Sequence, residues 1–243
     1  GQWFKVEPGP MADSGEWTHQ YGNAGNTTSS DEKLGGATQT DQLEVQWVGR
    51  PGADFGIDRN PRMPAPLSSW GRLFHQGMNR MIALDAYNGS ALWSLEIPDL
   101  RRVNMPRDAS NWCTDGKALF VAVKDRCWEI DAANGHRKAA HSMPAPYSPE
   151  THDWGYVAQG GDLFFGSAVK KDSSYTAFFG GGMWYDKRVP QSAAKVCSDG
   201  VFAIGKTDGK VAWSHSGGAV LNPTISIRDN KVFFVESRNP EIL

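Results

Sequence analysis

The chain has 243 residues, with 25 basic and 27 acidic side chains and a formal charge of −2. This balance lacks the basic excess that would neutralise many phosphates, so it argues against nucleic-acid binding as the main activity. The longest apolar runs are far shorter than the roughly 20 residues that a membrane-spanning helix needs, and 27 glycines, 14 prolines and 10 tryptophans indicate many short elements joined by tight turns. We therefore expect an all-β fold.

Strand and turn patterns recur along the chain after an N-terminal segment, residues 1–42. That segment begins without a basic region followed by an apolar stretch, so no signal peptide is predicted. Residues 43–48 form the first predicted strand. Residues 81–93 then have the pattern of a strand, an Asn-Gly turn and a second strand, which is a strong hairpin signal. Two further copies follow at 127–135 and 201–213, so the turn glycines are Gly89, Gly135 and Gly209.

A second series of turns precedes these hairpins and gives the length of the repeat. Its members are Trp70-Gly71, Asp115-Gly116, Gly160-Gly161 and Asp229-Asn230. The first two intervals are 45 residues and the third is 69. The sequence therefore predicts units of about 45 residues, each with four short antiparallel strands, and an insertion at 170–195 in the third unit.

Tryptophan follows the same period. Trp47 and Trp93 are 46 residues apart, Ala139 occupies the next equivalent position, and Trp213 follows its turn glycine by four residues, as Trp93 does. We interpret these rings as wedges between adjacent sheets. The alternative is that they stack on a ligand.

Repeated four-stranded units of this length are typical of a β-propeller. Residues 83–93 resemble the PQQ-like (quinoprotein-type) propeller repeat, in which a strand ends in Ala-Leu-Asp and an Asn-Gly turn leads to a strand ending in Trp. The resemblance covers 43–243, and residues 16–27 are similar to the opening segment of such propellers. The units are about 64–98, 107–144, 152–215 and a partial 221–243. These make about three and three-quarter blades, so we expect one part of a larger propeller, completed by the same or another chain.

The loops that lead into the first strand of each unit are expected around the central channel. They carry Arg, Asp, His and Asn side chains that are suited to a carboxylate-bearing or phosphate-bearing ligand. The alternative is that the Arg and Asp side chains pair with one another and order the channel mouth. The ligand-binding candidates are Arg59, Arg62, Arg107, Asp108, His152, Asp153 and Asn222.

The insertion is rich in aromatic residues around three consecutive glycines, 180–182. Exposed aromatic side chains on a flexible segment are typical of a lid or a partner-docking surface. The alternative is an ordinary hairpin that packs back onto the propeller. The docking candidates are Phe178, Phe179, Trp184 and Tyr185.

Cys113, Cys127 and Cys197 lack the spacing of a zinc site or a haem attachment site, so no metal site is predicted. Because an odd number of cysteines cannot all pair within one chain, we expect free and mostly buried thiols.

The resemblance implies two functions. One is a non-catalytic domain that binds a ligand or scaffolds a protein partner, similar to the propeller lipoproteins of outer-membrane assembly, periplasmic and without a cofactor. The alternative is part of a quinoprotein-type oxidoreductase, or the propeller module of a larger enzyme, with PQQ and calcium. Asp153, beside His152, would be a candidate general base there, although the adjacent cysteine pair of such enzymes is missing. The aromatic content suggests carbohydrate binding as a third class.

Overall fold

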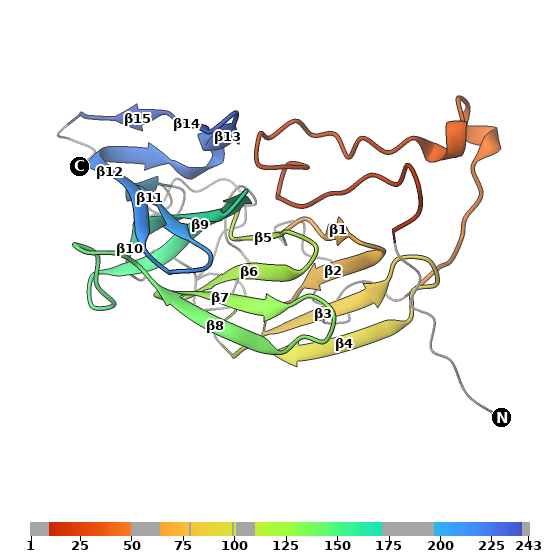
Figure 1. Ribbon diagram of the computed structural model, residues 1–243, viewed down its shortest axis with the longest axis horizontal. Helices are drawn as coiled ribbons and strands as arrows, with labels where there is room; N and C mark the ends of the chain where they lie inside the picture. The colour runs from red at the N-terminus through yellow and green to blue at the C-terminus, as the bar shows by residue number, and fades with distance from the viewer. Residues whose placement is uncertain are drawn as a thin grey trace, which may run out of the picture.

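A computed structural model describes residues 10–49, 64–77, 79–98, 100, 110–171 and 197–239. Antiparallel sheets stand side by side around a common centre, as Figure 1 shows. Blade 1 consists of β1 (Leu67–Ser69), β2 (Arg72–Gln76), β3 (Arg80–Asp85) and β4 (Ala91–Glu96). Blade 2 consists of β5 (Trp112–Thr114), β6 (Ala118–Val123), β7 (Arg126–Asp131) and β8 (Arg137–Ser142).

Blade 3 is the largest sheet. It contains β9 (His152–Gly160), β10 (Leu163–Lys170), β11 (Cys197–Gly205) and β12 (Val211–Leu221), with β15 (Glu236–Ser237) paired to one end of β12. A two-stranded hairpin, β13 (Ser226–Arg228) and β14 (Lys231–Phe233), follows as the start of blade 4. The predicted all-β propeller architecture is confirmed, and the described strands do not close a ring.

The repeat has a local physical cause at the turn between the third and fourth strands. In blade 1 the Asp85 carboxylate accepts hydrogen bonds from the amides of Tyr87 and Asn88, and Gly89 takes a φ of +72°. Asp131 and Gly135 form the same turn in blade 2. An aspartate that fixes the turn and a glycine that tolerates positive φ explain why this pair recurs.

Three apolar clusters fill the spaces between the sheets. The first joins blades 1 and 2, the second joins blades 2 and 3, and the third joins blade 3 to the hairpin. Cys113 and Cys127 are buried and Cys197 is half-buried, and all three are free, as expected. The helical elements within the described ranges are three-residue 3-10 turns, namely η1 (Leu34–Gly36), η2 (Thr40–Gln42) and η4 (Asn222–Thr224). None of them has the length or apolar character of a membrane-spanning helix.

The expectation of a strand at 43–48 is wrong. This segment lies outside blade 1 and forms no strand. Its large apolar side chains Leu43, Val45 and Val48 are exposed. The physical reason is that, among the described residues, no neighbouring strand supplies the backbone hydrogen bonds that an isolated extended segment needs. Trp47 is held by a contact described below.

Candidate functional site

Two blades receive a tryptophan ring in the same way. The Trp47 indole Nε1 donates to the carbonyl of Ala86 at 2.8 Å, and the Trp93 Nε1 donates to the carbonyl of Ala132 at 3.0 Å. In each case the ring lies over the turn glycine three residues after that carbonyl, where a Cβ would meet ring atoms. The interpretation as a wedge between adjacent sheets is confirmed for Trp93, whereas Trp47 makes the same contact from a segment that belongs to no described sheet.

The junction between blades 2 and 3 is built differently. Ala139 stands where a tryptophan would be, and Lys206 of blade 3 occupies the repeat position of the small residues Ala86 and Ala132. The equivalence is visible in the backbone, because the amide of each of these three residues donates to a carbonyl in the turn between the first two strands of its own blade. A long cation therefore enters the space where the other junctions hold an alanine.

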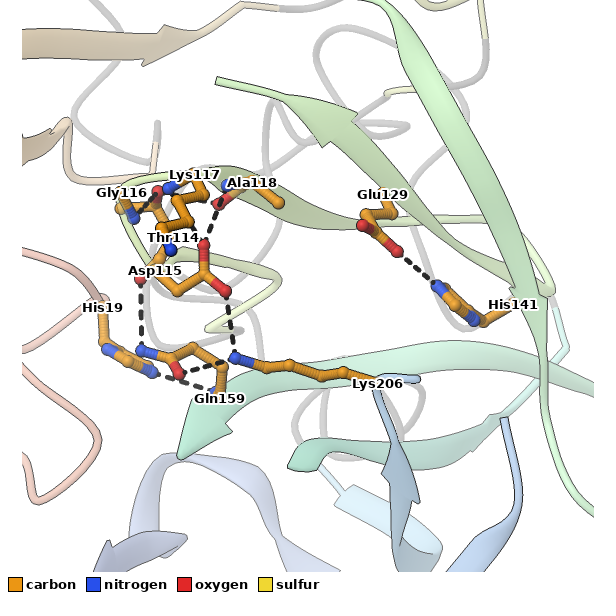
Figure 2. A network of polar contacts seen from close by, with 10 residues as sticks. All are labelled: His19, Thr114, Asp115, Gly116, Lys117, Ala118, Glu129, His141, Gln159 and Lys206. Carbon is orange, nitrogen blue, oxygen red and sulfur yellow. Dashed lines mark hydrogen bonds and ion pairs between the residues drawn. The ribbon is translucent and has the colours of Figure 1, made fainter. Parts of the chain in front are cut away.

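Lys206 links blade 3 to blade 2. Its Nζ lies 3.0 Å from Asp115 Oδ2 and 3.1 Å from Gln159 Oε1 (Figure 2). It also lies 5.5 Å from the centre of the Phe120 ring, within the range of a cation–π contact. Burial would raise the pKa of the Asp115 carboxyl, but hydrogen bonds from the Ala118 amide and from Lys206 hold that pKa below its usual value. The two side chains therefore form a charged pair.

His19 completes this polar cluster from the N-terminal segment. The backbone amide of Gln159 donates to His19 Nε2 at 3.1 Å (Figure 2), so the proton of the neutral ring is on Nδ1. That Nδ1 lies 2.8 Å from Thr18 Oγ1. Burial, aided by the nearby Lys206 charge, lowers the pKa of His19 to about 4. Gln159 also donates through Nε2 to the Thr114 carbonyl at 3.4 Å. The cluster joins four segments that are distant in the sequence.

The N-terminal segment contacts the first strand of every full blade. Trp17 exchanges backbone hydrogen bonds with Ser68 on β1, and the Thr18 carbonyl accepts from the amide of Thr114 on β5. His19 then meets Gln159 on β9, as described above. Figure 1 shows this segment in red beside β1 and β13.

The same segment continues to the hairpin of blade 4. The carbonyl of Ala24 accepts from the amide of Ile227 at 2.8 Å, and Asn26 Nδ2 donates to the carbonyl of Ile225 at 2.9 Å. The contacts at β1, β5 and β9 all fall near the turns to the second strands. Residues 16–27 therefore bind the blades together on the face opposite to the loops in which the sequence predicted chemistry.

Sequence reasoning missed His19, Gln159 and Lys206. One signal for Lys206 was present, because Gly205-Lys206 departs from the Asp-Ala pair of the other two copies of the turn. Nothing in the sequence points to the partnership of His19 with residue 159, because 140 positions separate them.

Three predicted ligand-binding residues, His152, Asp153 and Asn222, lie in the described part of the chain. His152 begins β9, and its Nε2 lies 3.1 Å from Asp199 Oδ2 on β11, while its ring meets the Tyr147 ring edge-on. Asp153 follows it on the same strand and pairs through the backbone with Val169. Successive side chains of a strand point to opposite faces, so the neighbouring His and Asp are not placed to act as a pair.

Asn222 is buried at the end of β12. Its Oδ1 accepts a hydrogen bond from Ser198 Oγ at 2.6 Å and a longer one from Ser167 Oγ at 3.4 Å. Asn222 contacts these two serines inside blade 3, whereas His152 contacts Asp199 and Tyr147. The two candidate residues thus have different partners. The remaining candidates, Arg59, Arg62, Arg107, Asp108, Phe178, Phe179, Trp184 and Tyr185, lie outside the described residues.

A calcium-bound quinone needs several oxygen ligands around the ion. Within the described ranges, no three His, Cys, Asp or Glu side chains come together in a way that would hold a metal ion.

Large apolar side chains are exposed on both open sides of the array. Next to blade 1 these are Leu43, Val45 and Val48. Next to the incomplete blade 4 they are Trp213, Phe233 and Val235, with Trp213 38% exposed. Apolar side chains that gather at an unpaired side of a sheet array are typical of a contact surface for another protein segment.

Comparison with known proteins yields only likenesses between structures. No family model and no curated protein sequence matches the chain. A europium-containing methanol dehydrogenase is 14% identical over 71% of this chain and 37% of its own length, with a TM-score of 0.44. BamB from Moraxella catarrhalis is 10% identical over 72% of this chain and 47% of its own length, with a TM-score of 0.41. A quinohemoprotein alcohol dehydrogenase from Comamonas testosteroni is 9% identical over 63% of this chain and 21% of its own length, with a TM-score of 0.39.

The chain forms four-stranded propeller blades that do not close a ring within the described residues. It spans less than half the length of each of these three proteins. Likenesses at these identities concern the fold alone, and their scores carry no argument about activity.

Proposed function

We propose that this chain is a non-catalytic, protein-binding part of a β-propeller that uses its open sides to hold a protein partner. The observation that carries the proposal is the exposure of Trp213. The equivalent rings of Trp47 and Trp93 each cover a turn of the next blade, whereas Trp213 has no such turn beside it among the described residues.

The exposure of other large apolar side chains supports the same function. Val45 is 79% exposed and Val48 is 89% exposed on one open side, while Phe233 and Val235 are each more than half exposed on the other. Burying such side chains against a partner gains roughly 25 cal/mol for each Å² of apolar surface removed from water. A periplasmic location, implied by the resemblance, belongs to this proposal.

Proximity labelling with the full chain in its native cell tests the proposal. We expect wild type to label a reproducible set of neighbours, and Val45→Asp or Phe233→Asp to lose members of that set, because each places a charge on an apolar contact surface. Trp70→Ala, at another exposed tryptophan, is the control and should retain the set. Identical sets from all four proteins would contradict the proposal.

Calorimetric titration with PQQ and calcium addresses the oxidoreductase alternative. We expect no saturable heat. Saturable binding that is lost in Asp153→Asn would overturn the non-catalytic assignment.

A further inference from the structure

The junction between blades 1 and 2 shows what a complete blade offers to a tryptophan ring. Phe74, Ala83 and Trp93 are cross-strand neighbours on β2, β3 and β4. This row packs against blade 2, which includes Ile130 and Ala132 at the end of its third strand, β7. The third strand and its turn therefore supply both apolar contact and the carbonyl that accepts from Trp93.

Blade 3 presents the same row to an incomplete neighbour. Phe165, Ala203 and Trp213 are cross-strand neighbours on β10, β11 and β12 in the same order. Beside them lies an open groove of about 630 Å³, whose opposite wall includes Ile227 and Val232 of the hairpin. Among the described strands β14 pairs only with β13, so its other edge is where a third strand of blade 4 would pair.

From these equivalences we propose that the groove binds a strand and turn of a partner polypeptide by addition to the free edge of β14. The strand runs antiparallel to Lys231–Phe233, alternates apolar and polar residues, and ends in an Asp-Ala-x-Asn-Gly turn. The inference rests on the proposed function and names the chemistry of the partner on one of the two open sides.

Each part of this motif is complementary to a group in the groove or on β14. Backbone amides and carbonyls of the added strand pair with those of β14, the mode of strand addition to an exposed sheet edge. Alternate apolar side chains face the row of Phe165, Ala203 and Trp213. The turn carbonyl three residues before the glycine accepts from Trp213 Nε1, and the glycine leaves room for the ring, as Gly89 does for Trp47 and Gly135 for Trp93.

The chain itself contains a probe with this pattern. Residues 80–96 comprise strand, Asp-Ala-Tyr-Asn-Gly turn and strand. A synthetic peptide of this sequence, labelled with a fluorophore, is titrated with the full chain, and binding is followed by fluorescence anisotropy. Hydrogen exchange of the same complex reports on the backbone of β14. A peptide with Gly89→Val is the matched control, because its side chain would collide with the tryptophan ring.

We expect saturable binding and slower exchange of the β14 amides. Trp213→Ala should weaken binding about tenfold, within the range for a central aromatic contact, whereas Trp70→Ala should leave it unchanged. The Gly89→Val peptide should bind at least tenfold more weakly.

Three results would overturn the proposal: no binding at millimolar peptide, binding without protection of β14, or equal binding by Trp213→Ala. A dimer of the chain that Trp213→Ala abolishes, without peptide binding, would assign the groove to a second copy instead. If the peptide fails while Val45→Asp still removes labelled neighbours, this site is wrong and the proposed function stands.

Discussion

Replacing Trp93 by alanine should destabilise the chain more than the same change at Trp213. Trp93 is only partly buried, but its ring fills the junction between blades 1 and 2 and donates to the Ala132 carbonyl. Removing a large buried aromatic side chain costs about 3–5 kcal/mol, and the net value of a hydrogen bond is about 1 kcal/mol. We take the lower end because of the partial exposure, and expect a loss of about 3 kcal/mol.

Trp213 provides the internal control. It holds the same repeat position, but its ring covers no turn in the described structure, so we expect Trp213→Ala to cost about 1 kcal/mol. Urea denaturation followed by circular dichroism measures both losses. For a chain of this size, 3 kcal/mol corresponds to a fall of roughly 6–12 °C in Tm, against roughly 2–4 °C for 1 kcal/mol.

The acceptor side of the contact gives an independent check. Gly135→Ala combines an unfavourable positive φ with a clash against the Trp93 ring. The clash disappears in Trp93→Ala while the backbone strain persists, so the two changes should be less than additive. Equal losses for the two tryptophans, or additive effects of Gly135→Ala and Trp93→Ala, would refute the reasoning.

Three further predictions concern the junction of blades 2 and 3 and the segment that crosses it. The folded-state pKa of His19 is about 4 and the unfolded value is 6.5, so its stabilising effect is full above pH 6.5 and is lost as the pH falls toward 4. The unfolding free energies of wild type and His19→Gln, measured from pH 7 to pH 4, should therefore converge by up to about 3 kcal/mol. A double-mutant cycle with Lys206→Met and Asp115→Asn should give a coupling energy of about 1 kcal/mol, since the pair is mostly shielded from water. A coupling energy of zero would show that the pair does not stabilise the folded chain. Gly200→Ala should cost more than 2 kcal/mol by thermal denaturation, because its Cβ would overlap the Tyr147 hydroxyl; an unchanged Tm would show that the Tyr147 ring moves aside freely.

The repeat could be recognised from the sequence because its causes are local. An aspartate that accepts amide hydrogen bonds and a glycine with positive φ act within five residues, so Asp85 to Gly89 and Asp131 to Gly135 predict the same hairpin wherever they occur. The tryptophan period is also readable, because each ring follows its turn at a fixed distance along one strand. The blade architecture follows from these short-range patterns.

The environment of each side chain depended on contacts between distant segments. Trp213 has the same sequence pattern as Trp93 but a different environment, since only the neighbouring sheet decides whether a ring is covered. The strand expected at 43–48 failed for the same reason, because strand pairing needs a partner that local sequence does not supply. The cluster of His19, Gln159 and Lys206 exists because the N-terminal segment crosses three blades, and only tertiary structure brings those residues together.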